Sequence, residues 1–285
     1  MLPEWLAIKP ATTAKYGRIK DTVAALGMRT VCIDAHCPNM AECWSSGTAT
    51  FMVLGRTCTR GCRFCAVEKS AKGESIDALE PVKLAGAIKE WKLNYVVITS
   101  VCRDDLHDQG ASHFAACIKE IKRVNPKILV ELLIPDFNGD AECLQTIIDA
   151  HPDVIGHNLE TVERISPTIR DRRASYAQSL EVLKRVKERN KKIYTKSAMM
   201  LGLGETKEEV IRTLNDLRSV GVDFMALGQY LRPTKRHVEV SEYIMPEAFE
   251  RMKKKALDIG FLYVAAGPFV RSSYKAGEYF SRLKK

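Results

Sequence analysis

The sequence lacks several features, each of which would define a class of protein. In its 285 residues no apolar run approaches the length of about 20 residues that a membrane-spanning helix needs. No apolar signal segment follows Met1, and the opening Met-Leu-Pro-Glu-Trp is not rich in Ser and Arg as a transit peptide would be. There is no low-complexity linker and no repeat with a period of roughly 20–50 residues. We therefore expect one soluble domain with extensions and no membrane partner.

A stacking-aromatic motif of the known RNA-binding modules is also absent, although the chain is basic, with 44 Lys and Arg against 35 Asp and Glu and a net charge of +9. The surplus has three interpretations: a nucleic-acid surface, solvated helix faces, or a surface that is complementary to an acidic protein. The run 184–192 has the spacing of an exposed helix end. Composition alone favours solvated helix faces, and we expect no nucleic-acid partner.

Cysteine, in contrast, is concentrated, since six of the nine cysteines lie within residues 32–65. They form a C-x4-C-x5-C triad and a C-x3-C-x2-C triad, namely Cys32, Cys37 and Cys43, then Cys58, Cys62 and Cys65. Short gaps allow three thiolates to converge, and iron–sulfur clusters are held by thiolates, normally four of them. Each triad is one ligand short, and open positions are where metal sites perform chemistry. The spacing predicts at least one iron–sulfur cluster.

Three other interpretations of these cysteines fit the sequence less well. A disulfide framework suits small secreted chains rather than one of 285 residues. Structural zinc usually shows paired cysteines with four ligands per ion, although His36 beside Cys37 could substitute as a ligand. Buried, inert cysteine is common, but six in this spacing would be a large coincidence.

The second triad, directly after the apolar run 51–54, resembles that of the radical S-adenosylmethionine (SAM) superfamily. The resemblance implies a [4Fe–4S] cluster on Cys58, Cys62 and Cys65 that binds and cleaves SAM to a 5′-deoxyadenosyl radical. The first triad, within Arg29 to Trp44, is similar to that of the lipoyl synthase family, in which such a segment carries a second, auxiliary [4Fe–4S] cluster. The Arg271-Ser-Ser-Tyr stretch resembles the motif of that family that supplies the fourth ligand, here Ser273.

This resemblance implies sulfur insertion at C6 and C8 of an octanoyl chain on a lysine of a carrier domain. The carrier would be the glycine cleavage carrier or a 2-oxoacid dehydrogenase acyltransferase, and the electron donor a ferredoxin or flavodoxin. Ser273 would be both ligand and catalytic residue, because a serine oxygen is a hard base that holds iron weakly and lets the auxiliary cluster surrender sulfide. Oxygen-sensitive clusters require a reducing compartment, which is the cytosol, or an organelle matrix if a transit peptide has been removed. Because nothing in the sequence indicates such a peptide, we expect the cytoplasm.

From residue 51 onward, apolar β-branched runs alternate with amphipathic stretches, which predicts an α/β fold with parallel βαβ units. Six expected strands fit the partial (β/α)6 TIM-like barrel of radical SAM enzymes: 51–54, 95–100, 128–134, 154–158, 193–200 and 224–230. Expected helices lie at 17–26, 82–92, 113–124, 141–150, 176–190 and 207–220, and the run 261–266 is a candidate edge strand. We divide the chain into an N-terminal extension (1–50), a barrel core (51–231) and a C-terminal extension (232–285).

Polar residues follow the expected strands, where a barrel of this type places its active groups. Thr99 and Ser100 are suited to accept from the amine of SAM, Asn158 and Glu160 to hold its hydroxyls, and Arg170 to pair with its carboxylate. Asp140 and Thr206 are more typical of helix caps. Other radical SAM enzymes, such as a methylthiotransferase or biotin synthase, would need neither the first triad nor the Ser273 motif. A zinc- or cluster-bearing RNA-binding protein is the alternative from another class.

The chain departs from the lipoyl synthase pattern at two places. Cys102 stands where that family usually has Asp or Asn. The stretch Leu106-His-Asp-Gln-Gly110 replaces the usual Leu-Pro-Asp-Gly-Gly. Cys102 is a candidate seventh ligand, but a spare thiol is the better interpretation, and Cys117 and Cys143 fall on apolar helix faces and are expected in the core.

Overall fold

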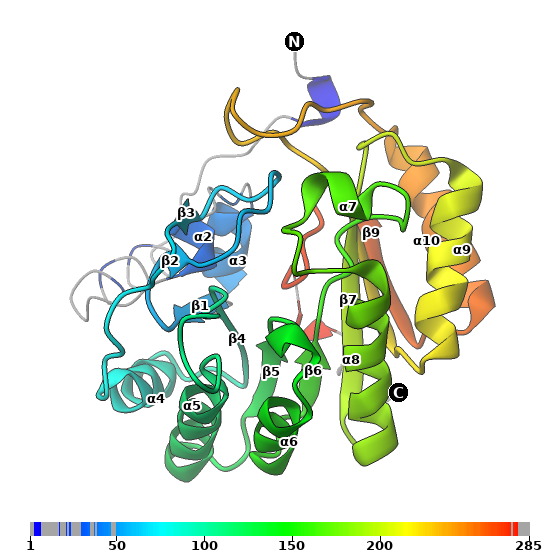
Figure 1. Ribbon diagram of the computed structural model, residues 1–285. Helices are drawn as coiled ribbons and strands as arrows, with labels where there is room; N and C mark the ends of the chain where they lie inside the picture. The colour runs from blue at the N-terminus through cyan, green and yellow to red at the C-terminus, as the bar shows by residue number, and fades with distance from the viewer. Residues whose placement is uncertain are drawn as a thin grey trace.

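The computed structural model describes residues 3–6, 17, 21, 23, 30–34, 37, 39–46, 50–274 and 276–278. In this part of the chain, strands and helices alternate around one curved parallel sheet, with the long helices on its outer face (Figure 1). No helix among these residues has the length and apolar character that crossing a bilayer demands.

The sheet has seven strands in the order β1-β4-β5-β6-β7-β8-β9, and every neighbouring pair is parallel. The strands are β1 (Thr50–Val53), β4 (Tyr95–Ser100), β5 (Leu129–Leu133), β6 (Val154–Gly156), β7 (Tyr194–Leu201), β8 (Phe224–Gln229) and β9 (Tyr263–Gly267). Among the described residues β1 does not pair with β9, so the barrel stays open. The prediction of a partial α/β barrel is therefore confirmed, and the candidate edge strand at 261–266 supplies a seventh strand.

Six long helices connect these strands, and their ends follow from capping residues. They are α4 (Glu80–Glu90), α5 (Ala111–Val124), α6 (Ala141–Asp149), α8 (Tyr176–Arg189), α9 (Lys207–Ser219) and α10 (Pro246–Ile259). Asp140 caps α6 by accepting from the amides of Glu142 and Cys143. Thr206 and Glu209 form a reciprocal capping box at the start of α9. Both expected caps are confirmed.

Shorter elements surround the open end of the barrel. They are η1 (Glu4–Leu6), α2 (Val31–Asp34), α3 (Met40–Ser46), η2 (Phe137–Gly139) and α7 (Ser166–Ile169), with the strands β2 (Thr57–Cys58) and β3 (Glu68–Lys69). A single antiparallel bridge joins Thr30 to Phe51 in β1. The helix expected over 17–26 lies largely outside the described residues.

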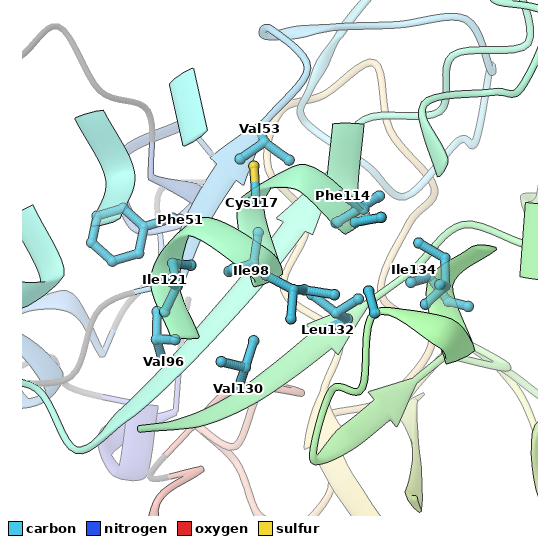
Figure 2. Close-up of a cluster of buried hydrophobic side chains, with 14 of the residues drawn as sticks. Phe51, Val53, Val96, Ile98, Phe114, Cys117, Ile121, Val130, Leu132 and Ile134 are labelled. Carbon is cyan, nitrogen blue, oxygen red and sulfur yellow. The ribbon is translucent and has the colours of Figure 1, made fainter. Parts of the chain in front are cut away.

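The core packs β1, β4 and β5 against α5 (Figure 2). Phe51, Ile98, Leu132 and Phe114 meet there with at most 1% of their surface exposed. Fully burying a side chain of this size stabilises the fold by roughly 1.5–3 kcal/mol. Cys117 lies in the same cluster and is fully buried, so the prediction that it is a core residue is confirmed.

After β9 the chain turns back into the interior of the barrel (Figure 1). We call the described residues 268–274 and 276–278 the C-terminal strap. Ala276 of the strap is fully buried against Val97, Val154 and Phe224 of three strands. Strand β9 and the strap thus bring part of the region 232–285 into contact with the barrel core. The boundaries at residues 50 and 231 stay a prediction.

Candidate functional site

The loop of the second cysteine triad lies at the carboxyl ends of the strands, where parallel barrels place their active groups. Arg60 sits within this loop, and its side chain is only 3% exposed. Its Nη2 donates to Asp104 Oδ1 at 2.8 Å and to Asn138 Oδ1 at 2.9 Å, and its Nη1 lies 2.7 Å from Asp136 Oδ1. Burial opposes the charge of Arg60, but the bond to Asp104 and the nearby acidic groups raise its pKa overall. The loop is therefore anchored to two further strand ends.

Other contacts hold the same loop from the side of α7. The amide of Gly61 donates to Asp171 Oδ2 at 2.7 Å, and the amide of Asp171 donates to the sulfur of Cys62 at 3.3 Å. The carbonyl of Cys65 lies 3.1 Å from Nε2 of His237. Amide donors that point at sulfur stabilise the thiolate form, which is the form that binds metal.

The three thiols of this triad differ in acidity. A hydrogen bond from the thiol of Cys102 stabilises the thiolate of Cys58 and lowers the pKa of Cys58 to about 6. Burial raises the pKa of Cys62, and it raises the pKa of Cys65 to about 12. Cys102 therefore takes the role of a donor to a candidate ligand.

A cavity of about 300 Å³ opens beside this triad. It is lined by the three cysteines and by all five residues predicted to contact SAM, namely Thr99, Ser100, Asn158, Glu160 and Arg170. These residues come from the ends of β4 and β6 and from the end of α7. The structure therefore brings the predicted cluster ligands and the predicted SAM contacts together around one space.

Hydrogen bonds fix the side chains that face this cavity. Thr99 donates its hydroxyl to the carbonyl of Leu133 at 2.8 Å, and Ser100 donates to the carbonyl of Val101 at 2.8 Å. Because each hydroxyl proton is used, both oxygens are left to act as acceptors. Arg170 donates to Ser179 Oγ at 2.9 Å, and only part of its five-donor guanidinium is used by its bonds in the described chain.

Two acidic groups on this cavity lack full compensation. Burial raises the pKa of Glu160, and Arg170 and Asn158 oppose that effect. Glu160 also has a left-handed backbone with φ of 69°, which is uncommon for a residue other than glycine. Asp136 uses Oδ1 on Arg60, while its buried Oδ2 has no hydrogen-bond partner in the described residues. A ligand with a suitable donor would satisfy that oxygen.

A second cavity, of about 190 Å³, adjoins the first. Cys32, Cys37 and Ser273 line it together with Arg271 and the inner faces of β7 and β8. Both cavities share six wall residues: Val31, Thr50, Asn158, Glu160, Ser272 and Ser273. Cys43 is buried in α3 and does not line either cavity. The structure thus unites three of the four predicted auxiliary ligands.

Contacts between the two ends of the chain shape this second cavity. Asn39 donates its side-chain amide to the carbonyl of Phe269, and Tyr274 donates to both carboxylate oxygens of Glu42 at 3.0 and 3.1 Å. Burial raises the pKa of the Cys32 thiol and of the Cys37 thiol. The strap therefore holds the first triad against the barrel.

A larger groove of about 620 Å³ lies between α9 and α10 and contains none of the predicted site residues. Its rim carries both Lys and Glu side chains. The two smaller cavities, unlike this groove, are lined by cysteines and by polar groups at strand ends. We therefore take them as the candidate functional site.

Comparisons with known proteins decide the family. A model of the radical SAM superfamily matches residues 52–217. The mitochondrial lipoyl synthase of Aedes aegypti is 53% identical over 284 residues, which cover 98% of this chain and 72% of that protein. The apicoplast lipoyl synthase of Plasmodium falciparum is 51% identical over 278 residues, covering 98% of this chain and 67% of that protein.

The chain belongs to the lipoyl synthase family. It is a radical SAM enzyme of the sulfur-transferring kind, as the sequence resemblance implied. Two solved structures share the fold of this lipoyl synthase family member. Methylornithine synthase (PylB) superposes with a TM-score of 0.54 and 11% identity, covering 89% of this chain and 79% of that one. The hydrogenase maturase HydG from Carboxydothermus hydrogenoformans superposes with a TM-score of 0.58 and 12% identity, covering 94% of this chain and 78% of that one.

The expected cytoplasmic location is wrong by the same comparison. Similar lipoyl synthases from Aedes aegypti and Culex quinquefasciatus are named mitochondrial, and those from Plasmodium species are named apicoplast. These names suggest an organelle. The prediction used the absence of a transit peptide at the start of this sequence, and that absence did not identify the compartment.

The donor set fits the groups that the lipoyl synthase family implies. Cys58, Cys62 and Cys65 line one cavity with a thiolate-stabilising donor and two amide contacts in place. Soft sulfur ligands of this kind suit iron–sulfur clusters. In the part of the chain that the structure describes, no group of three His, Cys, Asp or Glu side chains is arranged to hold a single metal ion.

Sequence reasoning missed the residues that hold the site together. It did not single out Arg60, His157 or Asp171. His157 is buried between Ile134 O at 2.9 Å and Ser179 Oγ at 2.8 Å, and it lines the first cavity. Arg60 lies between two cysteines of one triad in the sequence. A cation at that position is the signal from which its role could have been predicted.

Proposed function

We propose that this chain inserts two sulfur atoms, at C6 and C8 of an octanoyl chain that is bound to a lysine of a lipoyl carrier domain. The observation that carries the proposal is the shared wall of the two cysteine-lined cavities, which includes Asn158, Glu160 and Ser273. A carbon radical formed beside one cavity would thus be close to sulfur held in the other. Identity above 50% to lipoyl synthases over nearly the whole chain supports the same reaction.

Cys58, Cys62 and Cys65 would hold the first [4Fe–4S] cluster. When bound there with SAM, that cluster supplies the radical chemistry that unactivated carbons require, since no acid or base can deprotonate them. Arg60 and its two carboxylate partners keep the loop fixed while the substrate changes. The amide of Asp171 and the thiol of Cys102 stabilise the thiolates.

The chain itself would bind and orient SAM. Thr99 and Ser100 present acceptor oxygens that suit the amine, and Asn158 and Glu160 suit the ribose hydroxyls. Arg170 keeps donors for the carboxylate. The free Oδ2 of Asp136 adds an acceptor to this set, and it is suited to any remaining N–H or O–H of the ligand.

Cys32, Cys37, Cys43 and Ser273 would hold the second [4Fe–4S] cluster. Three of these residues line the second cavity, and Cys43 would reach it from α3. A serine oxygen is a harder base than a thiolate and holds iron of a cluster less firmly. Ser273 would thereby be the catalytic ligand, and a ligand of this kind would suit a cluster that supplies sulfur.

The substrate would arrive on an acidic carrier domain, of the glycine cleavage system or of a 2-oxoacid dehydrogenase acyltransferase. The net charge of +9 would favour docking of such a carrier. A ferredoxin or flavodoxin would supply the electron. Raising the salt concentration should then weaken carrier association, because charge contacts at a surface are screened; an affinity indifferent to salt would contradict charge-guided docking.

The test is anaerobic reconstitution followed by a count of iron, labile sulfide and zinc. Two clusters predict about eight irons per chain in the wild type, and about four after Cys58, Cys62 and Cys65 are all replaced by Ala. The matched control replaces Cys32, Cys37 and Cys43 by Ala, and it should keep about four irons and SAM cleavage but lose sulfur insertion. About four irons in the wild type and none in the first variant would contradict the second cluster, and zinc would contradict both.

A further inference from the structure

Arg271 is a cation in the second cavity, and it has no acidic partner among the residues that the structure describes. It lines that cavity beside Cys32, Cys37 and Ser273. Its Nη1 donates to the carbonyl of Val270 at 2.7 Å and, more weakly, to that of Pro268 at 3.4 Å. No carboxylate in the described parts of the chain lies within ion-pair distance of it. Both of its hydrogen-bond acceptors are neutral.

Three other arginines of the described chain are buried; two of them have ion pairs, and the third, Arg170, interacts electrostatically with Glu160. Arg60 pairs with Asp104 and Asp136, and Arg103 pairs with Asp105 at 2.8 Å. An uncompensated charge in a poorly solvated space is strongly destabilising, and proteins normally supply a counter-charge. Burial indeed disfavours the charged form of Arg271, and the Cys37 thiol opposes that effect as a potential anion. A counter-charge for Arg271 would therefore have to come from the cysteines of the second cavity or from a group that they hold.

Close packing fixes the position of this guanidinium. A Cβ built on Gly228 of β8 would lie 1.9 Å from the carbonyl oxygen of Val270 and 3.2 Å from Nη1 of Arg271. Only glycine allows the strap to approach the strand this closely. Arg271 is thus held at a set place on the cavity wall, and it does not extend from a flexible surface.

We propose that Arg271 is a positioning residue that balances the negative charge of the auxiliary cluster on Cys32, Cys37, Cys43 and Ser273. The inference rests on the proposed function, because it requires that cluster. Three thiolates and one serine alkoxide outweigh the positive charge of the inorganic core, so the assembly is anionic. The cluster supplies the counter-charge that Arg271 lacks, and Arg271 stabilises the more negative, reduced state most.

The experiment measures the auxiliary cluster alone, in a background with Cys58, Cys62 and Cys65 replaced by Ala. Arg271→Gln removes the charge, Arg271→Lys keeps it, and Arg164→Gln is the control. Arg164 is an exposed arginine paired with Glu209 at 2.7 Å on the outside of the barrel. Iron and sulfide are counted after reconstitution, and the reduction potential is measured by a redox titration followed by electron paramagnetic resonance.

We expect Arg271→Gln to disfavour the reduced state about tenfold, which is about 59 mV to lower potential for one electron. Arg271→Lys and Arg164→Gln should stay near the parent value. Loss of iron from Arg271→Gln but not from Arg271→Lys would support the same conclusion. An unchanged potential in Arg271→Gln, or equal loss of iron from the Gln and Lys variants, would overturn the charge-balance role. Absence of iron from the parent background would instead overturn the proposed second cluster.

Discussion

The two cysteine triads of this molecule are supported in different ways. The Cys58–Cys65 loop is fixed by contacts within the barrel, above all by Arg60, which joins Asp104 and Asp136 from neighbouring strand ends. The Cys32–Cys43 segment is fixed by the C-terminal strap, through Asn39 and Phe269, which are 230 residues apart in sequence. One site is local to the barrel mouth, and the other joins the two ends of the chain.

The acidity of the thiols differs between the triads at one position, because the pKa values of Cys62 and Cys65 in the barrel triad are raised, as are those of Cys32 and Cys37. Cys58 has a donor that lowers its pKa to about 6, so one thiolate of the barrel triad is present at neutral pH before metal arrives. Burial raises the pKa of Cys32 and of Cys37, so the first triad must release protons when it binds metal. The fold thus stabilises one thiolate of the radical-generating site in advance, whereas the proposed sulfur-donor site depends more on its metal and on the strap.

The largest effect should come from breaking the anchor of the barrel triad. Arg60→Met leaves Asp136 buried without its counter-charge and leaves Asp104 with only the more distant Arg173, and we expect a loss of about 3–5 kcal/mol in the free energy of unfolding. Denaturant titration of the metal-free protein measures it. Arg63→Met is the control in the same loop, because Arg63 is at the surface and, in the described part of the chain, its side chain donates only to the carbonyl of Thr168. Equal effects of the two variants would show that Arg60 does not anchor the site.

Acid should lower the free energy of unfolding through His157, which lines the first cavity. Burial lowers the pKa of His157 to about 4, from an ordinary value of about 6.5. Between these values the unfolded chain binds a proton that the folded protein does not, so the free energy of unfolding falls as pH falls, by up to about 3 kcal/mol. Unfolding measured from pH 7 to 4 checks this.

Two variants isolate the contribution of His157. His157→Gln should flatten the pH dependence between about pH 6.5 and 4, because no titrating group is left at that position. Ser179→Ala removes the hydroxyl 2.8 Å from Nε2 but keeps the buried ring, so its pH dependence should persist. A steep slope in His157→Gln would assign the acid sensitivity to other groups.

A smaller effect should follow from detaching the first triad from the strap. Asn39→Ala leaves the carbonyl of Phe269 without its side-chain donor, and we expect a loss of about 1–3 kcal/mol. After reconstitution the variant should lose auxiliary iron while SAM cleavage is kept. Asn215→Ala is the control, since Asn215 makes the same kind of bond, to the carbonyl of Ile211, on the exposed face of α9. Loss of SAM cleavage along with the iron would show that the two sites are not separately supported.

What the sequence could predict depended on how local each signal is. Strand runs such as 95–100 and 128–134 and the cysteine spacings are local patterns, and each was found because neighbouring residues alone define it. The Arg60 network was missed because its partners come from two separate loops, after β4 and after β5, which only the curvature of the sheet brings together with the cysteine loop. The position of Cys43 away from the second cavity also depends on long-range packing of α3, which ligand spacing does not encode.

The altered 106–110 loop gives the smallest expected effect and tests how far the barrel support extends. Gln109 has φ of 50°, in the left-handed region where the related family usually has Gly. Its side chain compensates by donating to the carbonyl of Phe137 at 2.9 Å and accepting from Asn138 at 3.0 Å, and Asn138 in turn accepts from Arg60. Gln109 is therefore the outer end of the network that anchors the cysteine loop.

Replacing Gln109 separates backbone strain from hydrogen bonding. Gln109→Ala loses both bonds and keeps the strain, and it should destabilise the protein by about 1–2 kcal/mol. Gln109→Gly loses the same bonds but relieves a left-handed cost of about 1–2 kcal/mol, partly offset by the greater freedom of Gly in the unfolded chain. Gly should thus be the milder change, the reverse of the order expected at an ordinary loop position. If Gln109→Ala proved the milder change, the backbone at Gln109 would not be strained. The bonds to Phe137 and Asn138 would then add stability to the network without compensating for backbone strain.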